Sequence, residues 1–143
     1  MPYRYLDHIA IADAAFEAKG DTTEELFIAA AEATLGIMIE DPSALPQHQD
    51  FSFRVEANNL AMLLFDFLQE LIFVKDARGL LLKVVLVRIE TGLKVHNLTA
   101  TAWAAPISHV RQRLLRDVKA VTFHRFQIRQ DGSRWSATVV LDI

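Results

Sequence analysis

The residues best suited to chemistry lie at the end of the chain. Asp142 is the penultimate residue, and Ile143 carries the final carboxylate. A hairpin that turns at residues 130–133 would place Val121 opposite Asp142. Lys119 would then lie within side-chain reach of both carboxylates. Because paired carboxylate oxygens suit a hard cation such as Ca²⁺ or Mg²⁺, the spacing predicts a cation site at this sheet edge.

Two acidic residues near the N-terminus are the nearest candidates for a further ligand. Asp13 and Asp7 stand in an otherwise apolar segment that is expected to form a strand. The alternative interpretation is a solvated terminus at which Lys119 makes an ordinary surface ion pair. The residues alone leave both interpretations open.

Several well-defined catalytic motifs do not occur in the sequence. It contains no G-x-x-x-x-G-K, G-x-G-x-x-G, H-E-x-x-H or G-x-S-x-G. The five histidines are scattered without an i, i+4 pair, and there is no cysteine to form a disulfide or a thiolate metal site. Common nucleotide hydrolases, dehydrogenases, metalloproteases and serine hydrolases therefore lose support.

Composition and charge bound the remaining possibilities. The 143 residues are 52% hydrophobic, which is typical of one domain with a sizeable core. Residues 1–70 carry 3 basic and 13 acidic side chains, whereas residues 71–143 carry 12 basic and 5 acidic ones. If the fold separates these halves, the basic one suits RNA or an acidic protein, and if it interleaves them, the charges neutralise each other.

The compartment follows from the absence of targeting signals. The opening residues lack the apolar core of a signal peptide, so the cytoplasm is expected. The longest apolar stretches are interrupted by charged residues and fall short of the about 20 apolar residues that a membrane helix needs, so no membrane association is expected.

The predicted elements form an α+β domain over residues 1–143, with two main helices packed on a mostly antiparallel β-sheet. A threonine cap with a glutamate three residues later predicts a helix over residues 23–39, and a second, buried helix begins near Asn58 or Asn59. Residues 107–117 could form a short basic helix or a loop. Strands are expected at residues 51–55, 81–89, 93–103, 118–129 and 134–143, with hairpins joining the second to the third and the fourth to the fifth.

Several stretches of the sequence carry a family resemblance. Leu6-Asp7-His8 followed by Ala12-Asp13 is similar to an opening D-H-T-A-D, and residues 118–124 read VKAVTFH against V-K-A-[VI]-T-Y-H. Residues 63–73 read LLFDFLQELIF, and residues 140–143 form a closing acidic terminus. In these stretches the chain resembles the archease family, the small accessory proteins of the RtcB-type RNA ligase.

The resemblance implies a function and a set of site residues. Archeases are non-enzymatic proteins that help the ligase load guanylate and turn over repeatedly in tRNA splicing and RNA repair. Their metal ligands fall here on Asp13, Asp142 and Ile143, and their activating lysine falls on Lys119. The implied cofactor is a divalent cation, with Ca²⁺ expected and Mg²⁺ or Mn²⁺ as alternatives. The implied partner is the ligase, with RNA reached indirectly through it.

This sequence departs from the family pattern near its start. Four residues separate His8 from Asp13 where the family has two. On a regular strand, this spacing would leave Asp7 and Asp13 on one face about 20 Å apart, so Asp13 is expected to be the ligand. Asp7, His8, Asp41 and His124 are candidates for supporting roles. His124 shares a predicted strand face with apolar residues, so a buried, hydrogen-bonded histidine is expected there.

Two other classes of function compete with the accessory role. A small metal-dependent phosphohydrolase or nuclease could use the same carboxylates, but the sequence offers no obvious general base. A chaperone-like RNA-binding module could use the basic half. That hypothesis lacks exposed aromatic residues beside the arginines, since Trp103 and Trp135 alternate onto apolar faces.

Overall fold

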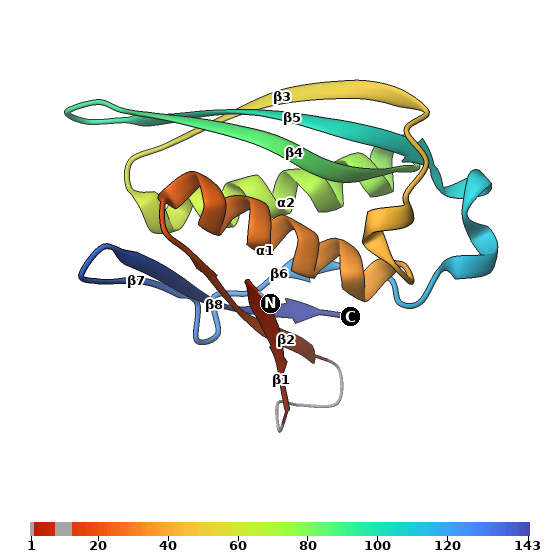
Figure 1. Cartoon of the computed structure of the whole chain (residues 1–143), viewed down its shortest axis with the longest axis horizontal. Coiled ribbons are helices and arrows are strands. Elements are labelled where there is room, and N and C mark those ends of the chain that lie inside the picture. The colour runs from red at the N-terminus through yellow and green to blue at the C-terminus, as the bar shows by residue number, and fades with distance from the viewer. Residues whose placement is uncertain (1, 8–12) are drawn as a thin grey trace.

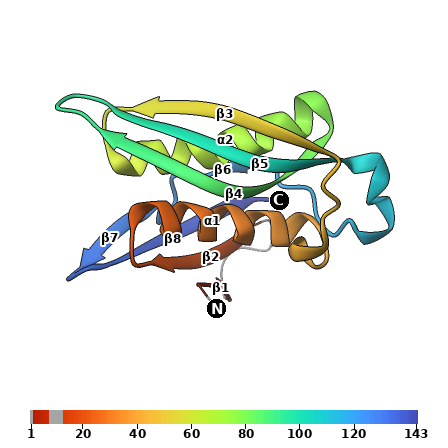
Figure 2. The same cartoon turned by 45° about the horizontal axis from the view of Figure 1, so that its top comes forward.

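Two helices lie between two antiparallel sheets. The computed structural model describes residues 2–7 and 13–143. Figure 1 shows three layers with the helices in the middle, and Figure 2 shows the smaller sheet from a direction turned by 45°. The predicted α+β class is confirmed, but the strands form two sheets rather than one. Alternating apolar residues indicate which face of a strand is buried and leave open which strands pair.

The larger sheet carries both chain ends. Its five strands follow the order β1-β2-β8-β6, and β7 also pairs with β8. The bounds are Tyr3–Leu6 for β1, Asp13–Gly20 for β2, Ala120–Val121 for β6, Gln127–Asp131 for β7 and Arg134–Asp142 for β8. In the smaller sheet, β5 (His96–Pro106) lies between β3 (Gln49–Ala57) and β4 (Leu80–Thr91).

Helix α1 (Thr23–Met38) begins with the predicted capping box. The Thr22 hydroxyl accepts a hydrogen bond from the Glu25 backbone N–H at 3.1 Å, and the Glu25 carboxylate accepts one from the Asp21 N–H at 2.8 Å. These contacts satisfy N–H groups that have no partner within the helix.

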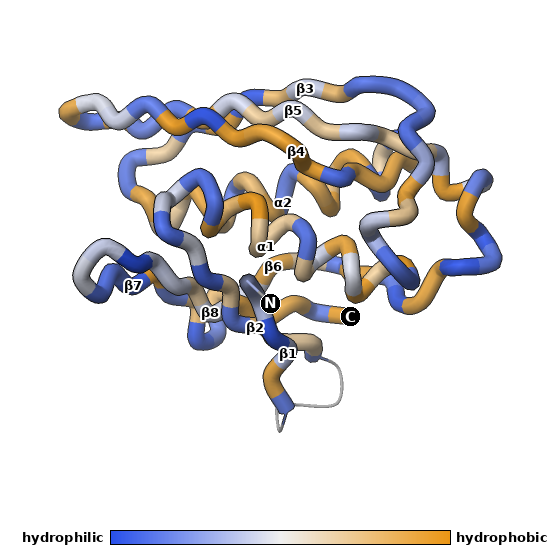
Figure 3. The backbone as a smooth tube through the Cα atoms, viewed as in Figure 1, coloured by the Kyte–Doolittle hydropathy of each residue, from blue (hydrophilic) through white to orange (hydrophobic). Residues whose placement is uncertain are grey.

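Helix α2 (Leu60–Arg78) fills the centre of the molecule. The Asn59 side chain caps its first turn, and Gly79, at φ 64°, ends it. The Phe67 ring is fully buried between Phe27 and Phe53, with ring centroids 5.5 and 5.8 Å away. Figure 3 shows hydrophobic residues concentrated along both helices. No helix among the described residues combines the length and hydrophobicity of a membrane span.

The β4–β5 hairpin is confirmed and is the longest ladder in the protein. Its pairing runs from Leu80 opposite Pro106 to Thr91 opposite His96, with one irregularity between Val84 and Leu86. Residues 107–117 were expected to form a short basic helix or a loop, and they form a loop that is partly helical. They contain two short 3-10 turns, Ile107–His109 and Arg111–Arg113, within a loop that leads to the larger sheet.

The predicted continuous strand over residues 118–129 is wrong. It is divided into β6 and β7, and residues 122–126 leave the sheet between them. The hairpin turn is shorter than predicted, because Gly132 adopts φ 64° and Asp131 pairs directly with Arg134. Together the break and the shorter turn change the register, so that Ala120 lies opposite Asp142 where Val121 was expected.

Candidate functional site

Asp13 and Asp142 lie directly opposite each other on neighbouring strands. They are the first pair of the β2–β8 ladder, and Ala120 flanks Asp142 on its other side. Directly opposed residues of an antiparallel pair have Cα atoms roughly 4.5–5.5 Å apart and side chains on the same face. Since the adjacent Leu141 is buried in the core, both carboxylates belong to the face that points away from the helices.

The two carboxylates form an uncompensated pair among the described residues. Like charges directly opposite each other on neighbouring strands are destabilising. Within the described part of the chain, no Lys, Arg or His nitrogen lies within 4.0 Å of either carboxylate. Such a donor set fits a hard divalent cation, which would remove the repulsion. No three His, Asp or Glu side chains of the described residues gather into a metal-binding group, so the pair supplies two side-chain donors only.

Lys119 lies beside the chain end. Its backbone N–H donates to the Asp142 carbonyl at 2.8 Å. Together with Arg116, Asp117 and Ile143, it lines a shallow hollow of about 300 Å³. Over residues 2–7 and 13–143, the Lys119 ammonium takes part in no ion pair, so the ordinary surface ion pair considered as an alternative is not observed there. The Lys119 side chain is exposed, and its backbone is bound to the strand end that carries Asp142 and Ile143.

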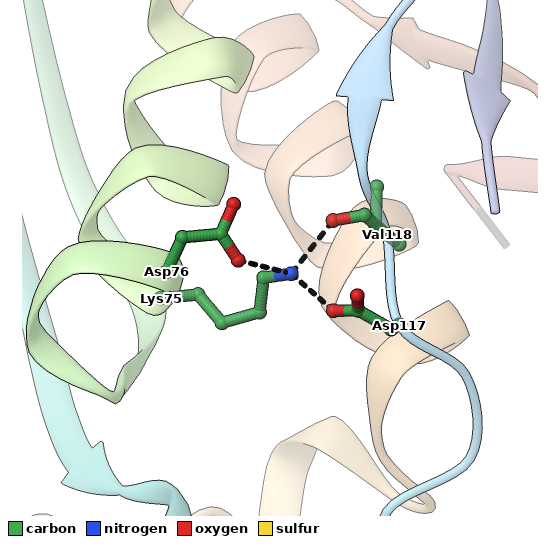
Figure 4. Close-up of polar contacts among 4 residues, drawn as sticks. All are labelled: Lys75, Asp76, Asp117 and Val118. Atoms are coloured by element: carbon green, nitrogen blue, oxygen red, sulfur yellow. Dashed lines mark hydrogen bonds and ion pairs between the residues drawn. The ribbon is translucent and has the colours of Figure 1, made fainter.

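A buried lysine of α2 holds the segment that precedes Lys119. Only 5% of the Lys75 side chain is exposed, and Figure 4 shows its ammonium among three oxygen atoms. It contacts the carboxylate of Asp117, the carboxylate of Asp76 at 2.9 Å and the carbonyl of Val118 at 2.7 Å. These three acceptors match the three N–H donors of an ammonium group. Lys75 thereby fixes the backbone immediately before Lys119.

A second side chain of α2 holds the other side of Lys119. The Gln69 side-chain oxygen accepts a hydrogen bond from the Val121 backbone N–H at 3.0 Å. Neither Gln69 nor Lys75 was predicted from the sequence to support the site. The available signal was a lysine and an amide within the apolar run of a central helix, where an unpartnered polar group would be costly.

The N-terminal residues return along the sheet instead of forming one strand. β1 and β2 pair as an antiparallel hairpin, with Leu6 opposite Ala15, and Asp7 follows β1 directly. The separation of about 20 Å assumed one regular strand from Asp7 to Asp13, and it does not apply because β1 and β2 run antiparallel. His8 lies outside the described residues.

The hairpin is fixed to α1 by Tyr5. Its hydroxyl donates to the Ala33 carbonyl at 2.8 Å, and a Cβ atom at Gly36 would come within 2.5 Å of that hydroxyl. Although 46% of the residue is exposed, its phenol points toward the helix. Burial, followed by the charge of neighbouring Tyr3, raises the pKa of Tyr5 above its usual value. The contact positions the hairpin whose second strand begins at Asp13.

The remaining supporting candidates lie in loops. Asp41 follows α1 at φ 48°, where its carboxylate accepts a hydrogen bond from the Ser43 hydroxyl. The prediction of a buried His124 is wrong: the residue is exposed in the turn between β6 and β7. Its predicted burial depended on a continuous strand, and the break removes that alternation. No metal-binding group among the described residues includes Asp41 or His124.

Comparisons with known proteins agree on one family. Residues 3–143 match the model of the Archease protein family (MTH1598/TM1083). The chain is 32% identical to Protein archease of Methanopyrus kandleri, over the full length of both proteins. It is similar to the solution structure of Methanobacterium thermoautotrophicum protein 1598, with a TM-score of 0.84, 30% identity and 99% of each chain covered. It also shares the fold of a Thermotoga maritima archease described as a possible chaperone, with a TM-score of 0.63, 21% identity and coverage of 94% and 93%.

Proposed function

The chain belongs to the archease family, and from this premise we propose that it is a non-enzymatic, metal-binding accessory protein of an RtcB-type RNA ligase. In this role it promotes guanylylation and repeated turnover of the ligase in tRNA splicing and RNA repair, in the cytoplasm. The observation that carries the proposal is the direct pairing of Asp13 with Asp142 beside Lys119.

The acidic pair is assigned to cation binding. Asp13 and Asp142 would hold a divalent cation, with the Ile143 carboxylate as a further oxygen donor. Ca²⁺ is the expected ion, and Mg²⁺ or Mn²⁺ are alternatives, since all three accept carboxylate oxygens. Such an ion supplies concentrated positive charge that can stabilise phosphate oxygens.

Lys119 is assigned to the ligase partner. Its ammonium has no neutralising carboxylate among the described residues, and its backbone is held on one side by Lys75 and on the other by Gln69. A lysine on a fixed backbone can bring positive charge to a transferring phosphoryl group and stabilise the charge that develops there. The exposed edge that carries Lys119 is therefore the part of the molecule that would enter the ligase active site.

The test is guanylylation of a purified RtcB-type ligase by labelled GTP, with and without this protein. The wild-type protein should raise the yield and rate, and Lys119→Ala and Asp142→Asn should remove the increase. Lys94→Ala and Asp131→Asn are matched controls, because they alter an exposed lysine and an exposed aspartate at the tips of other hairpins. Equal activity of Lys119→Ala and wild type would contradict the proposal.

Calcium titration by calorimetry tests the cation site separately. Asp13→Asn and Asp142→Asn should each weaken Ca²⁺ binding, whereas Asp131→Asn should not.

Incubation of the protein alone with RNA and nucleotides tests the competing enzyme hypothesis. Metal-dependent hydrolysis that disappears in Asp142→Asn would favour a phosphohydrolase or nuclease instead.

A further inference from the structure

One continuous segment gathers much of the positive charge of the protein. Residues 111–129 contain six basic side chains and one acidic side chain, Asp117, which is bound by Lys75. In the part of the chain that the structure describes, none of the six forms an ion pair. The six are Arg111, Arg113, Arg116, Lys119, Arg125 and Arg129. No close ion pair among the described residues therefore neutralises these six charges.

An exposed aromatic ring lies within this basic segment. Phe123 is 67% exposed although it is large and apolar. One face of its ring stacks on Phe65, with centroids 4.2 Å apart and planes 4° apart, and Phe126 packs against Phe65 edge-on. The stack holds Phe123 in one orientation and leaves its other face open to solvent.

The turn that presents Phe123 is anchored to the sheet. The Thr122 backbone N–H and hydroxyl both donate to the Val140 carbonyl at 3.0 Å, and the Phe126 N–H donates to the Phe123 carbonyl at 3.2 Å. Arg125 adopts φ 54°, a left-handed conformation that is unfavourable for a residue other than glycine. The turn therefore exposes an aromatic residue and an arginine two positions apart in the chain.

We propose that residues 111–129 bind single-stranded nucleic acid, with the open face of Phe123 as the stacking platform for one unpaired base. Proteins that bind single strands combine a positively charged path for the phosphates with aromatic rings on which bases stack. The sequence analysis expected no exposed aromatic residue beside the arginines, and the division of the predicted strand supplies one. This inference goes beyond the proposed accessory role, which requires only the Lys119 edge.

The charge of the segment that carries Phe123 favours nucleic acid over a protein partner. A second phenylalanine, Phe73 on α2, is exposed to a comparable 58%. Its helical neighbours at i−3 and i+3 are Glu70 and Asp76, both acidic, so that ring lacks cations for phosphates. The two rings differ in their electrostatic surroundings more than in exposure, which makes Phe73 a matched control.

The experiment is fluorescence anisotropy of a labelled, unstructured RNA of about 12 nucleotides with the protein alone. Wild type should bind with an affinity that falls as salt rises. Phe123→Ala should weaken binding about tenfold, because one base loses its stacking partner. Arg125→Asn removes one cation while keeping a residue that tolerates positive φ, and should lower the salt slope by about 0.7.

Controls separate stacking from general effects of substitution. Phe73→Ala and the exposed β4 variant Arg88→Gln should bind RNA like wild type. Phe123→Trp should retain binding and show RNA-dependent fluorescence quenching beyond that of Trp103 and Trp135. DNA of the same sequence should also be bound, because every base offers a π-face, with any preference for RNA arising elsewhere in the segment.

Three outcomes would overturn the inference. They are no binding by the wild-type protein, an equal loss in Phe73→Ala and Phe123→Ala, and unchanged RNA binding by Phe123→Ala. If the last outcome is accompanied by lost binding to the ligase, the ring is a protein contact. Guanylylation measured without RNA does not need the platform, so failure of this inference and failure of the proposed accessory role give different results.

Discussion

The β4–β5 hairpin and the β6–β7 edge show two ways in which this chain holds strands in place. β4 and β5 pair along the smaller sheet with one irregularity, and β5 also pairs with β3 on its other side, so backbone groups there find their partners in neighbouring strands. β6 and β7 both pair with β8, but residues 122–126 separate them. At this edge, backbone groups also find partners in side chains of α2.

The difference matches the proposed roles of the two regions, stability for the hairpin and function for the edge. The regular hairpin ends in an exposed tip, whereas the divided edge carries the exposed cation of Lys119 and the exposed ring of Phe123. Departures from local regularity are expected where a protein presents functional groups, because such groups cannot be buried or paired. Substitutions in the core should therefore alter folding, and substitutions at the edge should alter binding more than folding.

The largest effect on stability is expected at Phe67. Phe67→Ala removes a fully buried ring between Phe27 and Phe53 and should lower the free energy of unfolding by about 3–5 kcal/mol, because it leaves a cavity between the sheets. Urea denaturation measures the loss. Phe67→Leu should lose less, and under conditions where Phe67→Ala remains folded, its stimulation of the ligase should match wild type.

Lys75→Met should lower both the stability of the protein and its stimulation of the ligase. It leaves the Val118 carbonyl without its donor, which should lower the free energy of unfolding by about 1–3 kcal/mol. Ligase stimulation at saturating protein should fall further than this loss of stability explains, because the backbone before Lys119 is released. Lys83→Met is the control, because it removes an ion pair between β4 and α1, the Lys83–Glu32 pair. Full stimulation by folded Lys75→Met would show that the clamp has only a structural role.

A smaller effect is expected at Tyr5 and depends on pH. Burial raises the pKa of Tyr5 in the folded state, so its contribution to stability is complete below the unfolded value of about 10 and is lost as the pH rises above it. Tyr5→Phe should lose about 1 kcal/mol from the missing hydrogen bond to Ala33. Denaturation midpoints measured from pH 8 to about 11 should decline less steeply in Tyr5→Phe than in wild type. Identical slopes would exclude Tyr5 as the source of alkaline destabilisation.

The smallest effect is expected at the tip of the regular hairpin. Leu93 is fully exposed, so Leu93→Lys should change the free energy of unfolding by less than about 0.5 kcal/mol. It should also leave ligase stimulation and RNA binding unchanged. A marked loss of either activity would mean that this tip is a contact surface, and the proposed division between the two regions would fail.

The sequence predicted the parts of the fold that depend on local patterns. The cap at Thr22, the start of α2 after Asn59 and the β4–β5 hairpin each follow from residues close together in the chain. The division into two sheets does not, because strand pairing depends on contacts between distant segments. The register beside Asp142 was also wrong by one residue, since nothing in the apolar alternation of residues 118–129 indicates that five of them leave the sheet.

The residues of the candidate site could be proposed from the sequence, whereas the residues that hold the backbone beside them could not. The sequence placed Lys119, Asp142 and Ile143 together by hairpin pairing and offered Asp13 and Asp7 as further ligands, and the resemblance favoured Asp13. The structure places Asp13 opposite Asp142 and Lys119 next to Ile143. Lys75 and Gln69 could not be assigned this way, because their role depends on how α2 packs against a segment more than 40 residues away.

The turn between β6 and β7 has a consequence for how this protein can diverge. Val121 on one side and Gln127 on the other are each paired with β8, opposite Leu141 and Thr138. Residues inserted or deleted between these two anchor points would change the size of the projection without moving Asp142 out of alignment with Asp13. Recognition surfaces at this position can therefore vary in length across evolution while the strand end keeps its geometry.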